Sequence, residues 1–165
     1  MAKYKLMVDT KRCIGCHSCE VACKEEFNLP VGPQMIRVVK AGPRKVGKKL
    51  VIDYVPVFCK HCENPPCIKA CPEDALYKRV DGIVLVDKDK CIGCQICIDA
   101  CPINAPTLNR DTGKVELCNL CAQRIDIGLE PLCKIVCPAR CIYFGESQEV
   151  NRIMQDKNVK DLLEF

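Results

Sequence analysis

Residues 91–102 read CIGCQICIDACP, four cysteines in a single short stretch. The same pattern recurs three times with different gaps. The related stretches are CIGCHSCEVAC at 13–23, CKHCENPPCIKACP at 59–72, and CNLC at 118–121 followed, after eleven residues, by CKIVCP at 133–138. Every group closes with Cys-x3-Cys, and three of the four continue into proline. The chain is therefore one cysteine unit used four times, with Cys141 left over.

Cysteine makes up 17 of the 165 residues, well above its share in ordinary domains. The apolar content of 48% includes these cysteines, and the chain has four Phe, four Tyr and no Trp. A core so poor in large side chains predicts that something besides side-chain burial holds the fold together. The length excludes a large barrel or a multidomain enzyme. The net charge of +4, spread along the chain, gives little support to nucleic-acid binding.

The N-terminal segment predicts a cytoplasmic chain. Residues 1–9, MAKYKLMVD, contain neither an apolar region of signal-peptide length nor a cleavage site, and Lys11-Arg12 is not a twin-arginine signal. Apolar runs such as residues 83–86 are far shorter than the ~18 residues that span a bilayer, so no membrane span is expected. In a reducing compartment, a cysteine-rich chain indicates metal binding rather than disulfides, and the odd cysteine count agrees.

The spacing within the groups is typical of iron–sulfur ligation. Three cysteines at i, i+3 and i+6 wrap a loop around one centre, and a fourth, four residues later and before Pro, points elsewhere. This C-x2-C-x2-C-x3-C-P run is the bacterial ferredoxin pattern, in which the fourth cysteine ligates the other cluster of a pair. The 91–102 group matches completely, Lys24 replaces Pro in the first group, and the second group has a four-residue gap. Gly15 and Gly93 predict tight loops close to the inorganic core.

Zinc is the main alternative, because soft thiolates in sets of four select either a 4Fe-4S cubane or a tetrahedral zinc ion. Two CxxC pairs with a spacer describe a zinc ribbon, which fits the fourth group when it is taken alone. Three cysteines within seven residues suit a cubane better than a closed ion site. The haem-attachment motif CIGCH at 13–17 overlaps the longer cysteine run, which disfavours haem.

The residues beside the main ligands have weaker signals. His17 and His61, the only histidines, lie inside cysteine groups and either donate hydrogen bonds to cluster sulfurs or lie exposed without a role. Cys141 is expected to be a small buried residue rather than a ligand. No Ser-His-Asp set, phosphate loop or GxGxxG stands out, so we expect electron transport without substrate chemistry.

Short hairpins are predicted between the cysteine groups, with the longest joined by the loop AGPRKVGKK at 41–49. The predicted strands are 4–8, 35–39, 50–57, 75–78, 83–86, 107–109 and 114–117. Short helical turns are expected over 68–70 and 98–100. Residues 148–165 carry apolar side chains at roughly helical spacing, which predicts a helix docked on the protein's own core.

Four such groups, the second with a four-residue gap and the fourth with a long one, resemble the iron–sulfur electron-transfer subunits of the dimethyl sulfoxide reductase type. These accompany molybdenum or tungsten pterin oxidoreductases, and related short forms accompany tungsten aldehyde oxidoreductases. The resemblance extends from Lys11 to about Gly145 and includes CPARCIYFG at 137–145, where the family usually has a small residue in place of Cys141. It implies an α+β fold of two ferredoxin-like two-cluster modules, with short β-hairpins and short helices around four 4Fe-4S clusters.

The family pairs the first cysteine group with the fourth and the second with the third. The implied modules are residues 1–34 with 111–165, and an inserted module at 35–110. Fourth cysteines are exchanged within a module, so each cluster takes three cysteines from one group and one from its partner. The implied ligand sets are Cys13, Cys16, Cys19 and Cys137; Cys118, Cys121, Cys133 and Cys23; Cys59, Cys62, Cys67 and Cys101; and Cys91, Cys94, Cys97 and Cys71.

The resemblance implies a non-catalytic subunit that passes electrons between a large molybdo- or tungstopterin catalytic subunit and a soluble ferredoxin or NAD-linked acceptor. The catalytic subunit would be of the aldehyde oxidoreductase or formate dehydrogenase type. A freestanding polyferredoxin is the alternative with the same chemistry, and a zinc-binding interaction protein is the remote one. Many relatives have a membrane anchor, whereas this chain is short, so direct quinone reduction is not expected. Each oxidised cubane with four thiolates carries about −2, which would make the assembled protein acidic.

Overall fold

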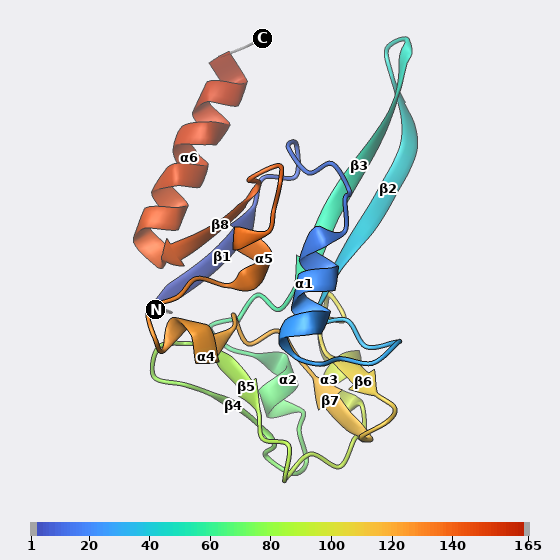
Figure 1. Ribbon diagram of the computed structural model, residues 1–165, viewed down its shortest axis with the longest axis vertical. Coiled ribbons are helices and arrows are strands. Elements are labelled where there is room, and N and C mark those ends of the chain that lie inside the picture. Colours follow the sequence, from blue (N-terminus) through green and yellow to red (C-terminus); the bar gives the residue numbers. More distant parts are fainter. Residues whose placement is uncertain (1–2, 164–165) are drawn as a thin grey trace.

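The computed structural model describes the backbone of residues 3–163 and the side chains of residues 3–157. Short helices alternate with two-stranded antiparallel sheets, which is the predicted α+β composition (Figure 1). The elements are β1 Tyr4–Val8, α1 Ser18–Glu26, β2 Ile36–Val46, β3 Lys49–Phe58, α2 Pro66–Lys69, β4 Leu76–Lys78, β5 Val84–Val86, α3 Ile96–Asp99, β6 Thr107–Asn109, β7 Lys114–Glu116, α4 Ala122–Ile125, α5 Leu132–Ile135, β8 Ile142–Glu146 and α6 Ser147–Leu163.

Strands β1 and β8 join the two ends of the chain in one antiparallel sheet, with Tyr4 opposite Glu146 and Val8 opposite Ile142. The rings of Tyr4 and Phe144 stack with their centroids 5.7 Å apart. Figure 1 shows the two strands side by side. Because β1 leads into the first cysteine group and β8 follows the fourth, this sheet holds these two groups near each other.

Strands β2 and β3 form a long hairpin that projects from the rest of the molecule (Figure 1). The loop predicted over 41–49 was wrong in extent, because both strands continue through this segment and turn at residues 47–48. The register shifts between Ala41 and Arg44, so an irregularity absorbs the Gly-Pro pair and the ladder resumes beyond it. Arg44 also pairs with Asp53 at 2.9 Å across the outer part of the hairpin.

The short hairpins β4–β5 and β6–β7 lie where they were predicted, to within one residue at each strand end. Helices α2 and α3 begin two residues before the predicted helical turns. Strand β8 and the residue ranges of helices α1, α4 and α5 were not predicted. Each of these four elements adjoins or contains a cysteine group, where metal-ligand spacing dominates the sequence and hides the ordinary apolar periodicity.

Helix α6 confirms the predicted C-terminal helix, and its first half docks on the β1–β8 sheet. Val150 is only 1% exposed, and Lys157 pairs with Asp9, which follows β1, at 3.2 Å. The predicted docking on the protein's own core is therefore confirmed for this half. The remaining apolar side chains on which that prediction rested lie outside the described residues: Val159, Leu162 and Leu163.

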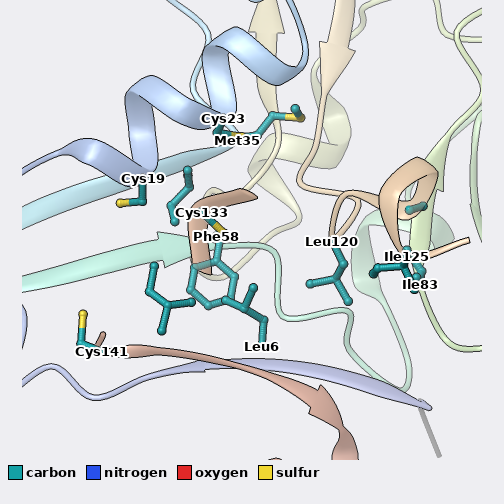
Figure 2. Packing of buried hydrophobic residues seen from close by; sticks show 13 residues of the cluster. Leu6, Cys19, Cys23, Met35, Phe58, Ile83, Leu120, Ile125, Cys133 and Cys141 are labelled. Atoms are coloured by element: carbon teal, nitrogen blue, oxygen red, sulfur yellow. The ribbon is translucent and has the colours of Figure 1, made fainter. Parts of the chain in front are cut away.

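Two groups of buried side chains form the core, and cysteines belong to both. The first group lies between α1, the β1–β8 sheet and the base of β3, where Figure 2 shows Phe58 beside Leu6 and Cys133. The second surrounds the short hairpins and consists of Cys59, Cys67, Ala75, Leu76, Val84, Cys91, Cys97, Ala105, Val115 and Leu117. Cysteine sulfurs therefore pack among aliphatic side chains in both groups.

The docking of α6 can be tested with Val150→Ala. Removing two buried methyl groups should cost about 2 kcal/mol, a transfer contribution plus a cavity contribution. When opening is fast relative to cleavage, proteolysis follows the population of the open form. Trypsin should therefore cut within α6 roughly tenfold faster or more. Gln155→Ala, at an exposed position of the same helix, is the control and should leave the cleavage rate nearly unchanged. Equal rates for the two variants would contradict the docked arrangement.

Candidate iron–sulfur cluster sites

The structure gathers the sixteen predicted cysteines around four cavities, each with four of the predicted residues. Cys13, Cys16, Cys19 and Cys137 line the first cavity; Cys23, Cys118, Cys121 and Cys133 the second; Cys59, Cys62, Cys67 and Cys101 the third; and Cys71, Cys91, Cys94 and Cys97 the fourth. These groupings coincide with the four ligand sets that the family resemblance implied. Cys141 also lines the first cavity, a position that spacing did not indicate.

The four cavities fit a bulky inorganic group better than a single ion. Four thiolates bound to one zinc stand about 2.3 Å from it, so their sulfur atoms must lie close together. Among the described residues, no three Cys, His, Asp or Glu side chains converge as a single-ion site requires. The sulfurs thus surround a volume, as cubane ligands do.

Each CxxC loop has its third residue in the left-handed conformation, which turns the chain sharply around its cavity. The φ angles are +66° at Gly15, +48° at His61, +69° at Gly93 and +56° at Leu120. The His61 N–H donates to the Cys59 sulfur at 3.4 Å. Burial raises the pKa of Cys118 well above its usual value, and a hydrogen bond from the Leu120 N–H offsets part of this rise. The second and fourth groups thus adopt with His and Leu the turn that the other two make with Gly, at a cost of about 1–2 kcal/mol each.

Glycine is required at Gly15 and Gly93 for a second reason, because other parts of the chain lie against them. A Cβ on Gly15 would stand 2.5 Å from the Tyr54 ring of β3, and a Cβ on Gly93 would collide with the Gly113 carbonyl. The predicted tight loops are confirmed. Each glycine lies against another part of the protein as well as beside its cavity, and the sequence did not indicate these protein contacts.

Short helices carry cysteines to two cavities at once. Helix α1 contains Cys19, at the first cavity, and Cys23, one turn later, at the second. Helix α5 contains Cys133 at the second cavity, and Cys137 just beyond it returns to the first. Helices α2 and α3 connect the third and fourth cavities in the same reciprocal way. A rise of about 1.5 Å per helical residue keeps the two cavities of a pair close together.

Burial makes the isolated thiolate form costly at these positions. It raises the pKa of Cys19 and of Cys59 to about 12 and that of Cys97 to about 11, with neighbouring cysteines adding to the effect. Burial also raises the pKa of Cys133 well above its usual value. Thiolate is the form that binds metal, so loading these sites must displace protons, and a bound metal centre supplies the compensating positive charge.

The two histidines differ in their surroundings. His17 Nδ1 lies 2.9 Å from Glu20 Oε2, and its side chain is about half exposed at the rim of the first cavity. His61 is 6% exposed, and its Nδ1 accepts the Val84 N–H at 2.9 Å. Burial and the nearby Lys78 lower the His61 pKa to about 4, so the neutral ring carries its proton on Nε2. That N–H has no partner among the described residues, and its donation to a cluster sulfur stays a prediction.

Comparison with known proteins agrees with this chemistry. Residues 50–147 and, overlapping with them, residues 12–75 match two families that share the description 4Fe-4S dicluster domain. Among the described residues, no helix has the length and apolarity needed to cross a membrane. The fold and cavities thus define a protein with two dicluster domains and four 4Fe-4S clusters.

The similar proteins are subunits of oxidoreductases. The thiosulfate reductase electron transfer subunit PhsB of Salmonella typhi is 41% identical, covering 95% of this chain and 84% of the relative. The formate dehydrogenase iron-sulfur subunit of Wolinella succinogenes is 36% identical over 96% and 89% of the two chains. A subunit of the anaerobic dimethyl sulfoxide reductase of Escherichia coli is 38% identical over 91% and 77%. This protein belongs to the same family of iron–sulfur electron-transfer subunits, which confirms the predicted membership and the non-catalytic class.

The close approach at Gly93 can be separated from backbone strain. Gly93 and Gly113 have nearly equal φ angles, +69° and +67°. A Cβ added to Gly93 would collide with the carbonyl oxygen of Gly113, whereas a Cβ added to Gly113 would meet open space. Ala in this conformation costs about 1–2 kcal/mol at either position. Gly113→Ala should therefore keep its full iron content. Gly93→Ala should displace the loop at the fourth cavity and lose about a quarter of the iron and sulfide, measured chemically. Equal losses would show that strain alone matters.

Proposed function

We propose that this chain is the electron-transfer subunit of a molybdo- or tungstopterin oxidoreductase in the cytoplasm. The observation that carries the proposal is the set of four cysteine-lined cavities connected from one to the next. The printed names of the relatives, subunits of thiosulfate reductase, formate dehydrogenase and dimethyl sulfoxide reductase, support a catalytic partner. When bound, a 4Fe-4S cluster accepts and releases one electron at a time.

The polypeptide orders the cavities in a line. Helices α1 and α5 connect the first with the second, and α2 and α3 connect the third with the fourth. Between the pairs, Phe58 lines the second cavity while Cys59 lines the third. In the same way, Leu117 lines the third cavity while Cys118 lines the second. Two adjacent-residue steps therefore bring the middle cavities together, and electrons would pass in the order one, two, three, four or its reverse.

The ligand sets proposed for the four cavities are those implied by the family, with the fourth cysteines exchanged. The lining residues of each cavity support these sets. We also propose the two modules, residues 1–34 with 111–165 and residues 35–110. The β1–β8 pairing, which brings the two ends of the chain together, supports the first module. Arg79 of the inserted module donates to Asp126 of the first module at 2.7 and 2.9 Å.

The outer cavities provide the ends of the route. Cys16 at the first and Cys94 at the fourth are exposed, and the neighbouring Ile14 and Ile92 are 62% and 61% exposed. Apolar side chains beside a cluster allow a partner to approach closely and exclude water. One end would face the catalytic subunit. The other would face a soluble ferredoxin or an NAD-linked module.

The partnership predicts the composition of the native complex. Gentle anaerobic purification from the source cells should recover the chain with a large subunit that contains tungsten or molybdenum. The preparation should hold about sixteen iron and sixteen sulfide per small chain, as four 4Fe-4S clusters require. Recovery of the fully loaded chain alone would favour a freestanding polyferredoxin. Colourless protein that contains zinc would contradict the electron-transfer function itself.

The exchange of fourth cysteines predicts non-additive losses. Cys13→Ala should remove one cluster and leave about twelve iron per chain. Adding Cys137→Ala should cost nothing further, because both residues would serve the first cluster. Adding Cys133→Ala should instead leave about eight iron, because that residue would serve the second. Iron analysis of the purified variants separates the cases. The opposite pattern would assign Cys137 to the second cluster and Cys133 to the first.

A further inference from the structure

The first cavity has a fifth thiol, whereas the linings of the other three have four each. Cys141 lines it together with Cys13, Cys16, Cys19 and Cys137. Its Sγ lies 3.5 Å from the Sγ of Cys137, and the residue is only 2% exposed. In Figure 2 the sulfur of Cys141, the residue just before β8, points toward Cys19. The Cys141 carbonyl accepts the Asp9 N–H at 2.8 Å, which anchors this backbone to the segment that follows β1.

Two other loops of the same chain show what normally occupies this position. The loop from Cys137 reads CPARC, and its counterparts are CPEDA at 71–75 and CPINA at 101–105. The residue before the last has φ between +47° and +48° in all three: Asp74, Asn104 and Arg140. In the counterparts, Ala75 and Ala105 donate their N–H groups to the sulfurs of Cys71 and Cys101, at 3.3 and 3.4 Å. Cys141 therefore stands where the repeated loop otherwise has alanine.

We propose that Cys141 is a positioning residue that donates an S–H hydrogen bond to the Cys137 sulfur and so raises the reduction potential of the first cluster. The inference rests on the proposed role of Cys137 as an iron ligand. A ligating cysteine is a thiolate without a proton, so the donor of the 3.5 Å pair must be Cys141. Hydrogen bonds to cluster sulfurs are one of the factors that set such potentials, and donation favours the more negative, reduced form.

The position of the Cys141 thiol at one end of the line of clusters would affect electron flow along the whole line. The first cavity is an end of the line, beside the exposed Cys16 and Ile14, so its cluster would exchange electrons directly with a partner. A higher potential at that end draws electrons toward it from the interior clusters. The same loop at the interior third cavity, and at the fourth, has alanine and provides only a backbone donor.

The test compares Cys141→Ala with Cys141→Ser in the chain with all four clusters. Both substitutions remove the sulfur, but only serine keeps a side-chain hydrogen-bond donor. The counterpart loops at 71–75 and 101–105 show that alanine suits this backbone conformation. Potentiometric titration followed by electron paramagnetic resonance should resolve the clusters. In Cys141→Ala one cluster should become harder to reduce, its reduced-to-oxidised ratio falling several-fold at the original midpoint potential. In Cys141→Ser that cluster should stay near the original midpoint, and the other three should not shift in either variant.

Other outcomes would overturn the proposal. Equal shifts of the midpoint potential in the two variants would show that the lost sulfur volume causes the effect. The absence of any shift would show that the hydrogen bond does not influence the potential. Iron and sulfide are measured on the same samples. If Cys141→Ala lost a whole cluster while Cys137→Ala kept all four, then Cys141 would be the ligand. Failure of the proposed electron-transfer function would give a different result from failure of this hydrogen bond. In that case the unsubstituted chain itself would not contain the expected sixteen or so iron atoms.

Discussion

The closure of four thiolates from distant segments around one inorganic group is the constraint on which the rest of this structure depends. In the first cavity, Cys13 and Cys137 meet from opposite ends of the chain. Cysteines are built into both groups of the core, among aliphatic side chains. Burial makes free thiolates costly at several of these positions, as the raised pKa values of Cys19 and Cys59 show. Metal binding therefore supplies folding free energy, and the site and the fold are the same structure.

The short helices convert this local chemistry into a route. A cubane takes four cysteine ligands, so a cavity that three other cysteines line has room for only one of two cysteines on the same helical turn. The other cysteine of the pair lines the neighbouring cavity. Helices α1 and α5 do this for the first and second cavities, and α2 and α3 do it for the third and fourth. The contacts at Phe58–Cys59 and Leu117–Cys118 add the middle step. The distances that govern electron transfer thus follow from a few turns of backbone.

Prediction from the sequence succeeded where a residue type has one physical use. The CIGC loops lie as predicted, because glycine adopts the φ angles of +66° at Gly15 and +69° at Gly93 without strain and has no Cβ to meet the neighbouring chain. Prediction failed where contacts with distant parts of the chain decide the local conformation. Strand β8 forms only because β1 is there to pair with it, and the β2–β3 ladder continues through a Gly-Pro pair that usually ends a strand. His61 and Leu120 adopt left-handed turns that no propensity indicates.

The sequence by itself determined that this is an iron–sulfur electron-transfer protein, because cysteine spacing is set by the geometry of the inorganic group rather than by the rest of the fold. It also separated sixteen of the cysteines from the seventeenth. Only the tertiary structure decided that Cys141 faces the first cavity, 3.5 Å from the Cys137 sulfur. It also decided which cavities are neighbours. Both outcomes depend on how distant strands pair and helices pack, and spacing along a chain carries no information about such contacts.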